Sequence, residues 1–428
     1  MAKRTVVIGL DGMPYRLIKD LAENGTMPNM KVLIEEGVFR QMESSIPEIS
    51  SVAWSSIITG TNPGVHGIFG FTDLAPGTYR TVFPNFSTLK ATPFWGREGA
   101  GRSVIINVPS TYPARKLDGV LIAGFVALDL EKATYPASLV PKLKAMDYRI
   151  DVDSQRAKES MSFFLKDLDR TLRARISAYR YLWGEEEWDT FMLVFTGTDR
   201  LAHFLWDAYE DESHTYHSAF LDHLRQIDEV IGEIVRGMAD KDAIVLLSDH
   251  GFELLEKEVY VNVVLKQERF LRFNREPPTS LKDIGDDTKA FALDPARVYV
   301  NLKGKYPRGC VNPEDREAVL ADLESIFDSL QIDGRRVIKR IYRKEEIYEG
   351  PFLERAPDLV LVANKGFNLR ANIKATQLWG KDIRTGKHSQ HDAFLLVKGE
   401  GAEEIVPEKP SVADVVSIMD KLRGRSLR

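Results

Sequence analysis

Five short polar motifs, each directly after an apolar run, supply the residue types that metal chemistry needs. They contain three aspartates, three histidines and a nucleophilic hydroxyl, and they are Asp11-Gly12, Ser50-Ser51, Asp199-Arg200-Leu201-Ala202-His203, Ser248-Asp249-His250-Gly251 and Gly386-Lys387-His388. Histidine nitrogen and aspartate oxygen both bind zinc readily. Because the chain has only 8 histidines, these motifs favour a site for two divalent metal ions that share one nucleophile.

The spacing inside two of the motifs brings ligand atoms together. Asp199 and His203 are four residues apart, so both lie on one face if this stretch is helical. Asp249 and His250 are adjacent in a turn, so both side chains can leave the end of one strand. Further ligands would be Asp11 and His388. Two ions held in this way can clamp a phosphoryl group and its attacking oxygen during an in-line displacement.

The nucleophile is inferred from its position. Ser50 is placed to cap a helix expected over residues 50–59, which Gly60 would end. At a helix N-terminus the partial positive charge favours an alkoxide or a phosphate. A coordinated metal ion lowers the pKa of the hydroxyl further, so no separate histidine base is needed. We therefore expect Ser50 to attack, and Ser51 only to shape the turn and donate its backbone N–H.

Each motif also has a purely structural explanation when it is taken alone. Asp11-Gly12 is typical of a turn, and Ser50 is typical of a helix cap. His391 follows His388 by three positions and competes with it as the last ligand, and either could be a surface histidine. Only the occurrence of all five motifs, in order, favours chemistry over these explanations.

Short apolar runs before the motifs predict the strands that position them. We expect strands at residues 5–10, 103–108, 119–125, 190–195, 243–247 and 394–397, and helices at 15–24, 50–59, 158–183 and 217–238. This alternation predicts an α/β fold with a mostly parallel central sheet and helices on both faces. Ligands of such sheets bind at the carboxyl ends of the strands, where Asp11, Asp199 and Asp249 fall.

The length of 428 residues exceeds the usual size of one domain. We expect residues 1–251 and 385–428 to form a catalytic core. Residues 252–384, which separate the fourth motif from the fifth, would form a small α+β insertion or cap.

Composition limits the partners and the compartment. The formal net charge of −5 gives no reason to expect a nucleic-acid polymer or a membrane surface as a partner. The one cysteine, Cys310, excludes a disulfide framework and a cysteine-based zinc site, and it fits a reducing compartment. The first apolar run, residues 5–10, is too short for the core of a signal peptide, and no apolar stretch reaches the 18 residues of a membrane span. We therefore expect a cytoplasmic protein.

In order and spacing, the motifs resemble the alkaline phosphatase superfamily, and within it the type I phosphodiesterase/nucleotide pyrophosphatase family. The resemblance runs from Val6 to about Val397. Besides the metal-ligand motifs, it is carried by Val7-Ile8-Gly9-Leu10-Asp11-Gly12, Ile58-Thr59-Gly60-Thr61-Asn62-Pro63-Gly64-Val65-His66-Gly67-Ile68 and Pro109-Ser110-Thr111-Tyr112-Pro113.

The resemblance implies an alkaline phosphatase-like fold with two metal sites. Carried over by position, one ion has the ligands Asp199, His203 and His388. The other ion has Asp11, Asp249, His250 and the nucleophile. We expect Zn²⁺ at both sites, and Mn²⁺ also fits the mixed ligands. Family spacing also favours Ser50, nine residues before Thr59, and it favours His388 because Asp392 follows it by four.

Two features depart from the nucleotide pyrophosphatase pattern. That family usually has a threonine nucleophile in a Thr-Phe-Pro stretch, where this chain has Ser50-Ser51-Val52. It also has an asparagine shortly after His-Gly-Ile, where this chain has Phe69-Gly70-Phe71. A serine nucleophile is common in the monoesterase and mutase branches of the superfamily.

Together these observations favour a metal-dependent hydrolase of small phosphate esters. The leading hypothesis is a phosphodiesterase or nucleotide pyrophosphatase that acts through a phospho-Ser50 intermediate. One alternative is a phosphomonoesterase or phosphomutase of the same superfamily. Another is a catalytically silent binding protein of this fold, although idle ligands would leave clustered carboxylates without compensating charge.

Overall fold

The computed structural model describes residues 3–424, and the chain forms two compact units. Unit 1 comprises Met1–Thr61, Asn85–Glu253 and Ile383–Arg428, and unit 2 comprises Asn62–Pro84 and Leu254–Asp382. The expected division placed residues 62–84 in the core, but they group with unit 2. Contacts within unit 2 explain the difference, because Tyr79 stacks on Tyr306 and donates a 2.7 Å hydrogen bond to Oδ1 of Asn301.

An eight-stranded sheet forms the centre of unit 1. Its strand order is β2-β20-β9-β1-β8-β5-β6-β7. The five strands in the middle are parallel to one another: β9 (Ala243–Leu247), β1 (Thr5–Leu10), β8 (Thr190–Phe195), β5 (Ser103–Val108) and β6 (Gly119–Ala123). On one side β20 (Ala393–Lys398) pairs antiparallel with β9, and β2 (Val38–Met42) pairs antiparallel with β20. On the other side β7 (Thr134–Tyr135) pairs antiparallel with β6. The predicted mostly parallel sheet is therefore confirmed.

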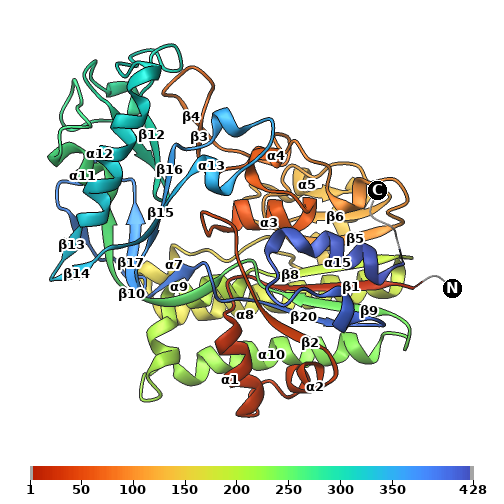
Figure 1. Ribbon diagram of the computed structural model, residues 1–428. Helices are drawn as coiled ribbons and strands as arrows, with labels where there is room; N and C mark the ends of the chain where they lie inside the picture. The colour runs from red at the N-terminus through yellow and green to blue at the C-terminus, as the bar shows by residue number, and fades with distance from the viewer. Residues whose placement is uncertain (1–2, 425–428) are drawn as a thin grey trace. The chain divides into compact units, whose positions relative to one another are not determined.

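Every residue of the five parallel strands is buried. Strands covered on both faces have continuous apolar runs instead of alternating ones, which is the pattern that the sequence contains. In Figure 1, α1 (Tyr15–Glu23), α2 (Pro28–Glu36) and α10 (His217–Arg236) lie on one face of the sheet, and α3 (Ser50–Thr59) and α15 (Val415–Leu422) lie on the other. The predicted helical layers are thus both present.

Two helices of unit 1 carry candidate residues, and a third, α8 (Met161–Glu185), packs against one of them, α9 (Gly197–Glu210). Helix α3 begins at Ser50 and ends where Gly60 takes the left-handed conformation, at φ +62°. Helix α9 follows β8 directly and contains the Asp199 motif. Helix α8 begins three residues later than predicted, because Ser160 is extended at φ −164° and separates it from a short helix, α7 (Arg156–Glu159).

Unit 2 is an α+β structure with its own core. One of its sheets has the order β11-β12-β16-β15, formed by Ala290–Leu293, Arg297–Val300, Leu359–Ala363 and Ile338–Arg343. Helix α12 (Arg316–Ser329) packs on this sheet and contributes Leu320, Leu323 and Phe327 to a fully buried cluster. Among residues 3–424, no helix combines the length and the apolar character needed to cross a bilayer.

Candidate metal centre

The candidate ligands lie at the carboxyl ends of three neighbouring parallel strands of unit 1. Asp11 directly follows β1, and Asp249 follows β9 by two residues. Asp199 is the third residue of α9, which β8 leads into. Because β9, β1 and β8 are adjacent in the sheet, segments distant in sequence meet at one edge, as open α/β sheets require.

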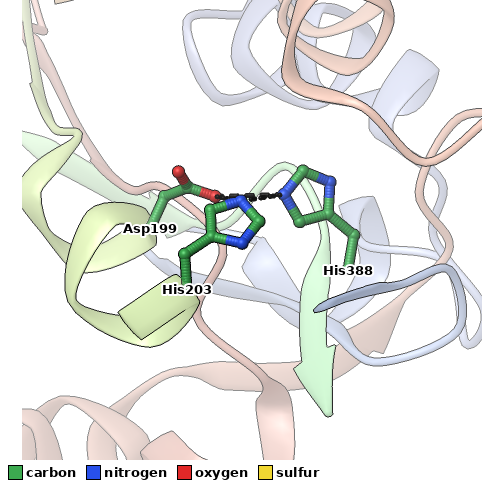
Figure 2. Close-up of side chains that lie close together, drawn as sticks. All are labelled: Asp199, His203 and His388. Atoms are coloured by element: carbon green, nitrogen blue, oxygen red, sulfur yellow. Dashed lines mark hydrogen bonds and ion pairs between the residues drawn. The ribbon is translucent and has the colours of Figure 1, made fainter. Parts of the chain in front are cut away.

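The first group of converging side chains is Asp199, His203 and His388 (Figure 2). Nε2 of His388 lies 3.1 Å from Oδ1 of Asp199 and 3.1 Å from Nε2 of His203. Nε2 of His203 lies 3.5 Å from the same Oδ1. His388 lies in strand β19 (Gly386–Ser389), whereas Asp199 and His203 lie in helix α9. The strand and the helix therefore both direct candidate ligand atoms toward one place.

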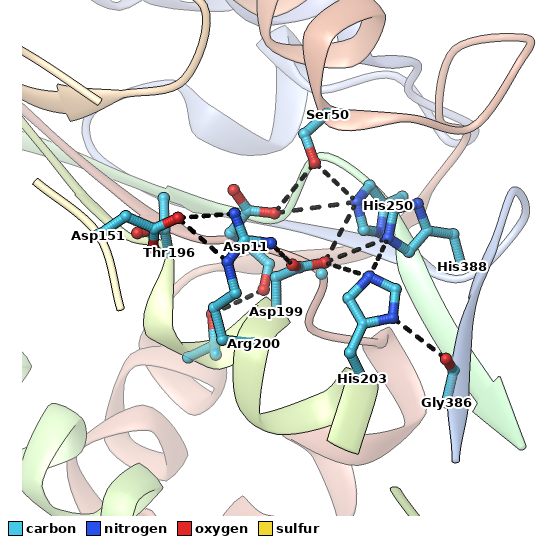
Figure 3. Close-up of polar contacts among 12 residues, drawn as sticks. Asp11, Ser50, Asp151, Thr196, Asp199, Arg200, His203, His250, Gly386 and His388 are labelled. Carbon is cyan, nitrogen blue, oxygen red and sulfur yellow. Dashed lines mark hydrogen bonds and ion pairs between the residues drawn. The ribbon is translucent and has the colours of Figure 1, made fainter. Parts of the chain in front are cut away.

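The second group is Asp11, Asp249 and His250, with Ser50 beside it. Figure 3 shows Asp11, His250 and Ser50 of this set. Nε2 of His250 lies 3.3 Å from Oδ2 of Asp249 and 3.8 Å from Oδ1 of Asp11. Oγ of Ser50 lies 3.2 Å from Nε2 of His250 and donates a 3.4 Å hydrogen bond to Oδ1 of Asp11. The two groups adjoin, because the rings of His250 and His388 stack with centroids 3.7 Å apart.

The same hydrogen-bond arrangement orients all three imidazole rings. In each ring Nδ1 lies close to a backbone carbonyl oxygen. The distances are 3.2 Å from His203 to Gly386, 2.9 Å from His388 to Glu48, and 3.1 Å from His250 to Gly251. A carbonyl oxygen only accepts hydrogen bonds, so each Nδ1 carries the proton. Each Nε2 therefore presents a lone pair to the carboxylates, which is the tautomer that a metal ligand needs.

Each of the three carboxylates has one oxygen held by a protein donor. Oδ2 of Asp11 accepts from the indole N–H of Trp54 at 3.2 Å, and Oδ1 of Asp249 accepts from the backbone N–H of Gly12 at 3.0 Å. Oδ2 of Asp199 accepts from Arg200 at 2.6 Å. The other oxygen of each carboxylate faces the histidines, and Oδ2 of Asp249 is buried without a hydrogen-bond partner in the described part of the chain.

The electrostatics of this pocket favour bound cations. Burial, together with the charges of Asp249 and Asp199, raises the pKa of Asp11 well above its ordinary value. Burial raises the pKa of Asp249 to about 6 and lowers the pKa of His203 to about 3. Imidazole nitrogens and crowded carboxylates are a donor set that fits divalent ions, which would supply positive charge beside the carboxylates.

Ser50 differs from the expected helix cap. Ile49 is the N-cap of α3, with no side-chain capping bond, and Ser50 is the first helical residue. Its hydroxyl is therefore directed at Asp11 and His250 and is not used to satisfy a backbone N–H. Oγ of Ser51 is buried and has no hydrogen-bond partner.

His391 does not belong to either group. Its Nδ1 lies 2.6 Å from Oε2 of Glu43, and its side chain is 43% exposed. His388 is the histidine that the structure brings to Asp199 and His203.

Sequence reasoning missed two residues of this centre, Trp54 and Arg200. Trp54 lies four residues after Ser50 on the same helix, which is a spacing that places both side chains on one face. Arg200 is adjacent to Asp199 in the chain. Either position could have drawn attention, but neither residue type is a metal ligand.

Comparisons with known proteins agree with the fold. The family model described as type I phosphodiesterase/nucleotide pyrophosphatase matches residues 5–391. No curated protein matches the chain. Phosphonoacetate hydrolase from Sinorhizobium meliloti 1021 is similar in structure, with a TM-score of 0.66 and 18% identity over 99% of this chain and 96% of that one. Murine ectonucleotide pyrophosphatase/phosphodiesterase 5 has a TM-score of 0.57 and 13% identity, over 99% of this chain and 96% of its own.

Proposed function

This chain belongs to the type I phosphodiesterase/nucleotide pyrophosphatase family, and on that premise we propose that it hydrolyses small phosphate diesters with two divalent metal ions and Ser50 as nucleophile. Membership makes the protein a phosphoester hydrolase of the alkaline phosphatase superfamily. The proposal adds the metal count, the ligands and the covalent intermediate.

The proposed ligands fall into the two groups described above. Asp199, His203 and His388 would hold one ion, and Asp11, Asp249, His250 and Ser50 would hold the other. Bound divalent ions lower the pKa of a coordinated hydroxyl and stabilise negative charge on phosphoryl oxygens. The carboxylate arrangement is the observation that carries the proposal, because each carboxylate keeps one oxygen on a protein donor and turns the other toward the imidazoles.

In the proposed reaction, Oγ of Ser50 attacks phosphorus and forms an O–P bond, so that Ser50 becomes part of a covalent phosphodiester intermediate. The bond from phosphorus to the leaving alcohol breaks, and that alcohol takes up a proton. Water then attacks the same phosphorus, releases the monoester product and returns the proton to Ser50. The position of Ser50 at the first turn of α3 supports this role, since the helix dipole favours negative charge there.

A phosphomonoesterase or phosphomutase is the second candidate. Its support is the serine at the nucleophile position, together with Phe69-Gly70-Phe71 where nucleotide pyrophosphatases have an asparagine. A silent binding protein of this fold would keep the same two ligand groups, so measured turnover separates it from the two enzyme candidates.

A rate panel on zinc- and manganese-loaded protein tests the proposal. It compares an aryl phosphodiester, an aryl phosphomonoester and a nucleotide, with Ser50→Ala and Ser51→Ala as matched variants. We expect the diester to be fastest, Ser50→Ala to lose several orders of magnitude in turnover while metal stays bound, and Ser51→Ala to be mild. A faster monoester would favour the second candidate, and unchanged turnover in Ser50→Ala would exclude the serine intermediate.

The location and partners are also proposals. The single cysteine, Cys310, is not in a disulfide and fits a reducing compartment, so we propose the cytoplasm. The substrate is proposed to be a small molecule, not a nucleic-acid polymer.

A further inference from the structure

Arg200 connects the first metal-ligand group, which consists of Asp199, His203 and His388, to the carboxylate of Asp151, which lies outside that group. Its Nη1 donates to Oδ2 of Asp199 at 2.6 Å, and its Nε and Nη2 donate to Oδ2 of Asp151 at 3.1 and 2.8 Å. Figure 3 shows the guanidinium lying between the two carboxylates. All three guanidinium nitrogens are therefore engaged within unit 1.

The surroundings of Arg200 limit the access of solvent to these contacts. The side chain of Arg200 is 14% exposed and that of Asp199 is 4% exposed. The ring of Phe125 covers one face of the guanidinium, with Cζ 4.2 Å from the ring centroid. Charge-assisted hydrogen bonds are stronger in such a poorly solvated setting than at a surface.

The segment that carries Asp151 is itself held by α8. The buried Arg175 of α8 donates to the carbonyl oxygens of Arg149 at 3.2 Å and Ile150 at 2.7 Å. Two residues past Asp151, the backbone N–H of Asp153 donates to Asp167 of α8 at 2.9 Å. The chain is thus fixed on both sides of Asp151, which places its Oδ2 under the guanidinium.

We propose that Arg200 and Asp151 are positioning residues for the first metal site: Arg200 occupies Oδ2 of Asp199 so that only Oδ1 faces the ion, and Asp151 keeps Arg200 there. The inference rests on the proposed function, because it concerns the ligand role of Asp199. Without Arg200, Asp199 can rotate or offer both oxygens, and its ligand atom is no longer fixed relative to His203 and His388. Asp151 acts only through Arg200, since its carboxylate contacts the guanidinium and not the ligand groups.

Metal affinity is the decisive measurement, because a merely structural ion pair would not change it. The dissociation constants of both Zn²⁺ ions are measured by competition with a chelating dye, in the intact chain and without substrate. Four variants are compared with the wild type: Arg200→Gln, Arg200→Lys, Asp151→Asn and the double variant Arg200→Gln/Asp151→Asn. Circular dichroism and thermal unfolding establish that each variant is folded.

Unit 1 offers a matched control. Arg4 donates through Nε and Nη2 to Oδ2 of Asp242 at 3.1 and 2.7 Å and lies over the ring of Trp188, with Cζ 4.4 Å from its centroid. These residues precede β1 and β9, at the edge of the sheet opposite the metal centre. Arg4→Lys and Arg4→Gln therefore remove a similar ion pair without touching the site.

We expect Arg200→Gln to lower the affinity for one of the two ions by about 10- to 100-fold, as is typical for partners of metal ligands. Asp151→Asn should lower the affinity for the same ion by a smaller factor. Arg200→Lys should retain part of the affinity that Arg200→Gln loses. The double variant should match Arg200→Gln, because Asp151 has no other route to the ligand. The Arg4 variants should leave both dissociation constants unchanged.

Two outcomes would overturn the inference. One is wild-type affinity for both ions in Arg200→Gln, and the other is additive losses in the double variant. If a variant fails to fold, Phe125→Leu, which removes only the ring over the guanidinium, still tests the arrangement by a smaller loss at the same ion. Failure of the proposed function is distinguishable, because the wild type itself would then bind fewer than two ions.

Discussion

The indole N–H of Trp54 donates a 3.2 Å hydrogen bond to Oδ2 of Asp11, a residue 43 positions earlier in the chain. Both side chains are buried, Trp54 completely. The bond therefore fixes one carboxylate oxygen of the second metal-ligand group, and it ties α3, which carries Ser50, to the end of β1. One tryptophan thus links the proposed nucleophile's helix to a proposed ligand.

Replacing Trp54 by phenylalanine tests this link. A phenylalanine ring lacks the indole N–H, so Oδ2 of Asp11 loses this hydrogen bond and stays buried without it. We expect the affinity for the second ion to fall by about 10-fold or more, with Zn²⁺ competition as the measurement. Trp95→Phe, at a buried tryptophan outside both ligand groups, is the control. Equal affinity in Trp54→Phe and the wild type would show that the bond does not position Asp11.

Gly9 makes the close approach of Trp54 possible. A Cβ atom at Gly9, in the middle of the central sheet, would lie 2.4 Å from Cη2 of Trp54. We expect Gly9→Ala to lower the free energy of unfolding by about 1–3 kcal/mol, the usual cost of overpacking a core. Urea titration measures the loss.

Gly184→Ala is the matched control for Gly9→Ala. Gly184 lies in α8, and a Cβ there meets nothing within 4 Å. Alanine favours a helix over glycine by about 1 kcal/mol, so this variant should be as stable as the wild type or more stable. A destabilisation equal to that of Gly9→Ala would contradict the steric explanation.

The sequence predicted the elements of unit 1 well where local signals are strong. Strands β1, β5, β8 and β9 have the predicted bounds, because each is a short buried run made mainly of apolar residues. Helix α3 also has its predicted bounds, since Gly60 ends it in a conformation that glycine adopts most easily.

What the sequence could not predict depends on contacts between distant residues. The Arg200–Asp151 pair joins positions 49 residues apart, and no local pattern tells which acid an arginine will meet. The grouping of residues 62–84 with unit 2 depends on the stacking of Tyr79 on Tyr306. The cap at Ile49 was missed because serine is the usual capping residue, whereas here the Ser50 hydroxyl faces Asp11.

Metal removal should lower both activity and stability. The proposed ligand groups place three carboxylates in a buried pocket, and bound cations relieve their repulsion only in the folded state. At a free metal concentration about 100 times the dissociation constant, one ion contributes about 2.7 kcal/mol. We expect exhaustive chelation to abolish hydrolysis and to lower the melting temperature, with Zn²⁺ restoring both. An unchanged melting temperature together with retained hydrolysis would contradict the metal requirement.

A buried histidine away from the metal-ligand groups should make the fold sensitive to acid. Burial lowers the pKa of His223 in α10 to about 4, and its Nε2 has no hydrogen-bond partner among residues 3–424. The unfolded chain binds a proton at this side chain below about pH 6.5 and the folded chain does not, so stability falls as the pH falls from 6.5 toward 4.

His223→Leu removes this contribution. Between pH 7.5 and pH 5 the free energy of unfolding should fall by about 2 kcal/mol less in the variant than in the wild type. The reason is that each pKa unit corresponds to about 1.4 kcal/mol. Urea titrations of both proteins at pH 7.5 and pH 5 measure it, and other titrating groups cancel in the comparison. His214→Leu, at a partly exposed side chain, should keep the wild-type difference. If the free energy of unfolding changes with pH equally in His223→Leu and the wild type, other groups cause the acid sensitivity.

His388, and not His391, is expected to be the histidine ligand that completes the first group with Asp199 and His203. Nε2 of His388 lies 3.1 Å from both Asp199 and His203, whereas His391 is bound to Glu43 and is 43% exposed. His388→Ala removes a nitrogen from the first ligand group, and the loss of metal affinity and activity should be at least about 10- to 100-fold, the range seen for groups that only support ligands. His391→Ala removes one half-exposed side-chain contact with Glu43, and it should change metal affinity and activity less than about twofold, since such surface contacts contribute about 0–1 kcal/mol. Zinc competition and diester turnover measure both variants, and a loss confined to His391→Ala would reassign the ligand.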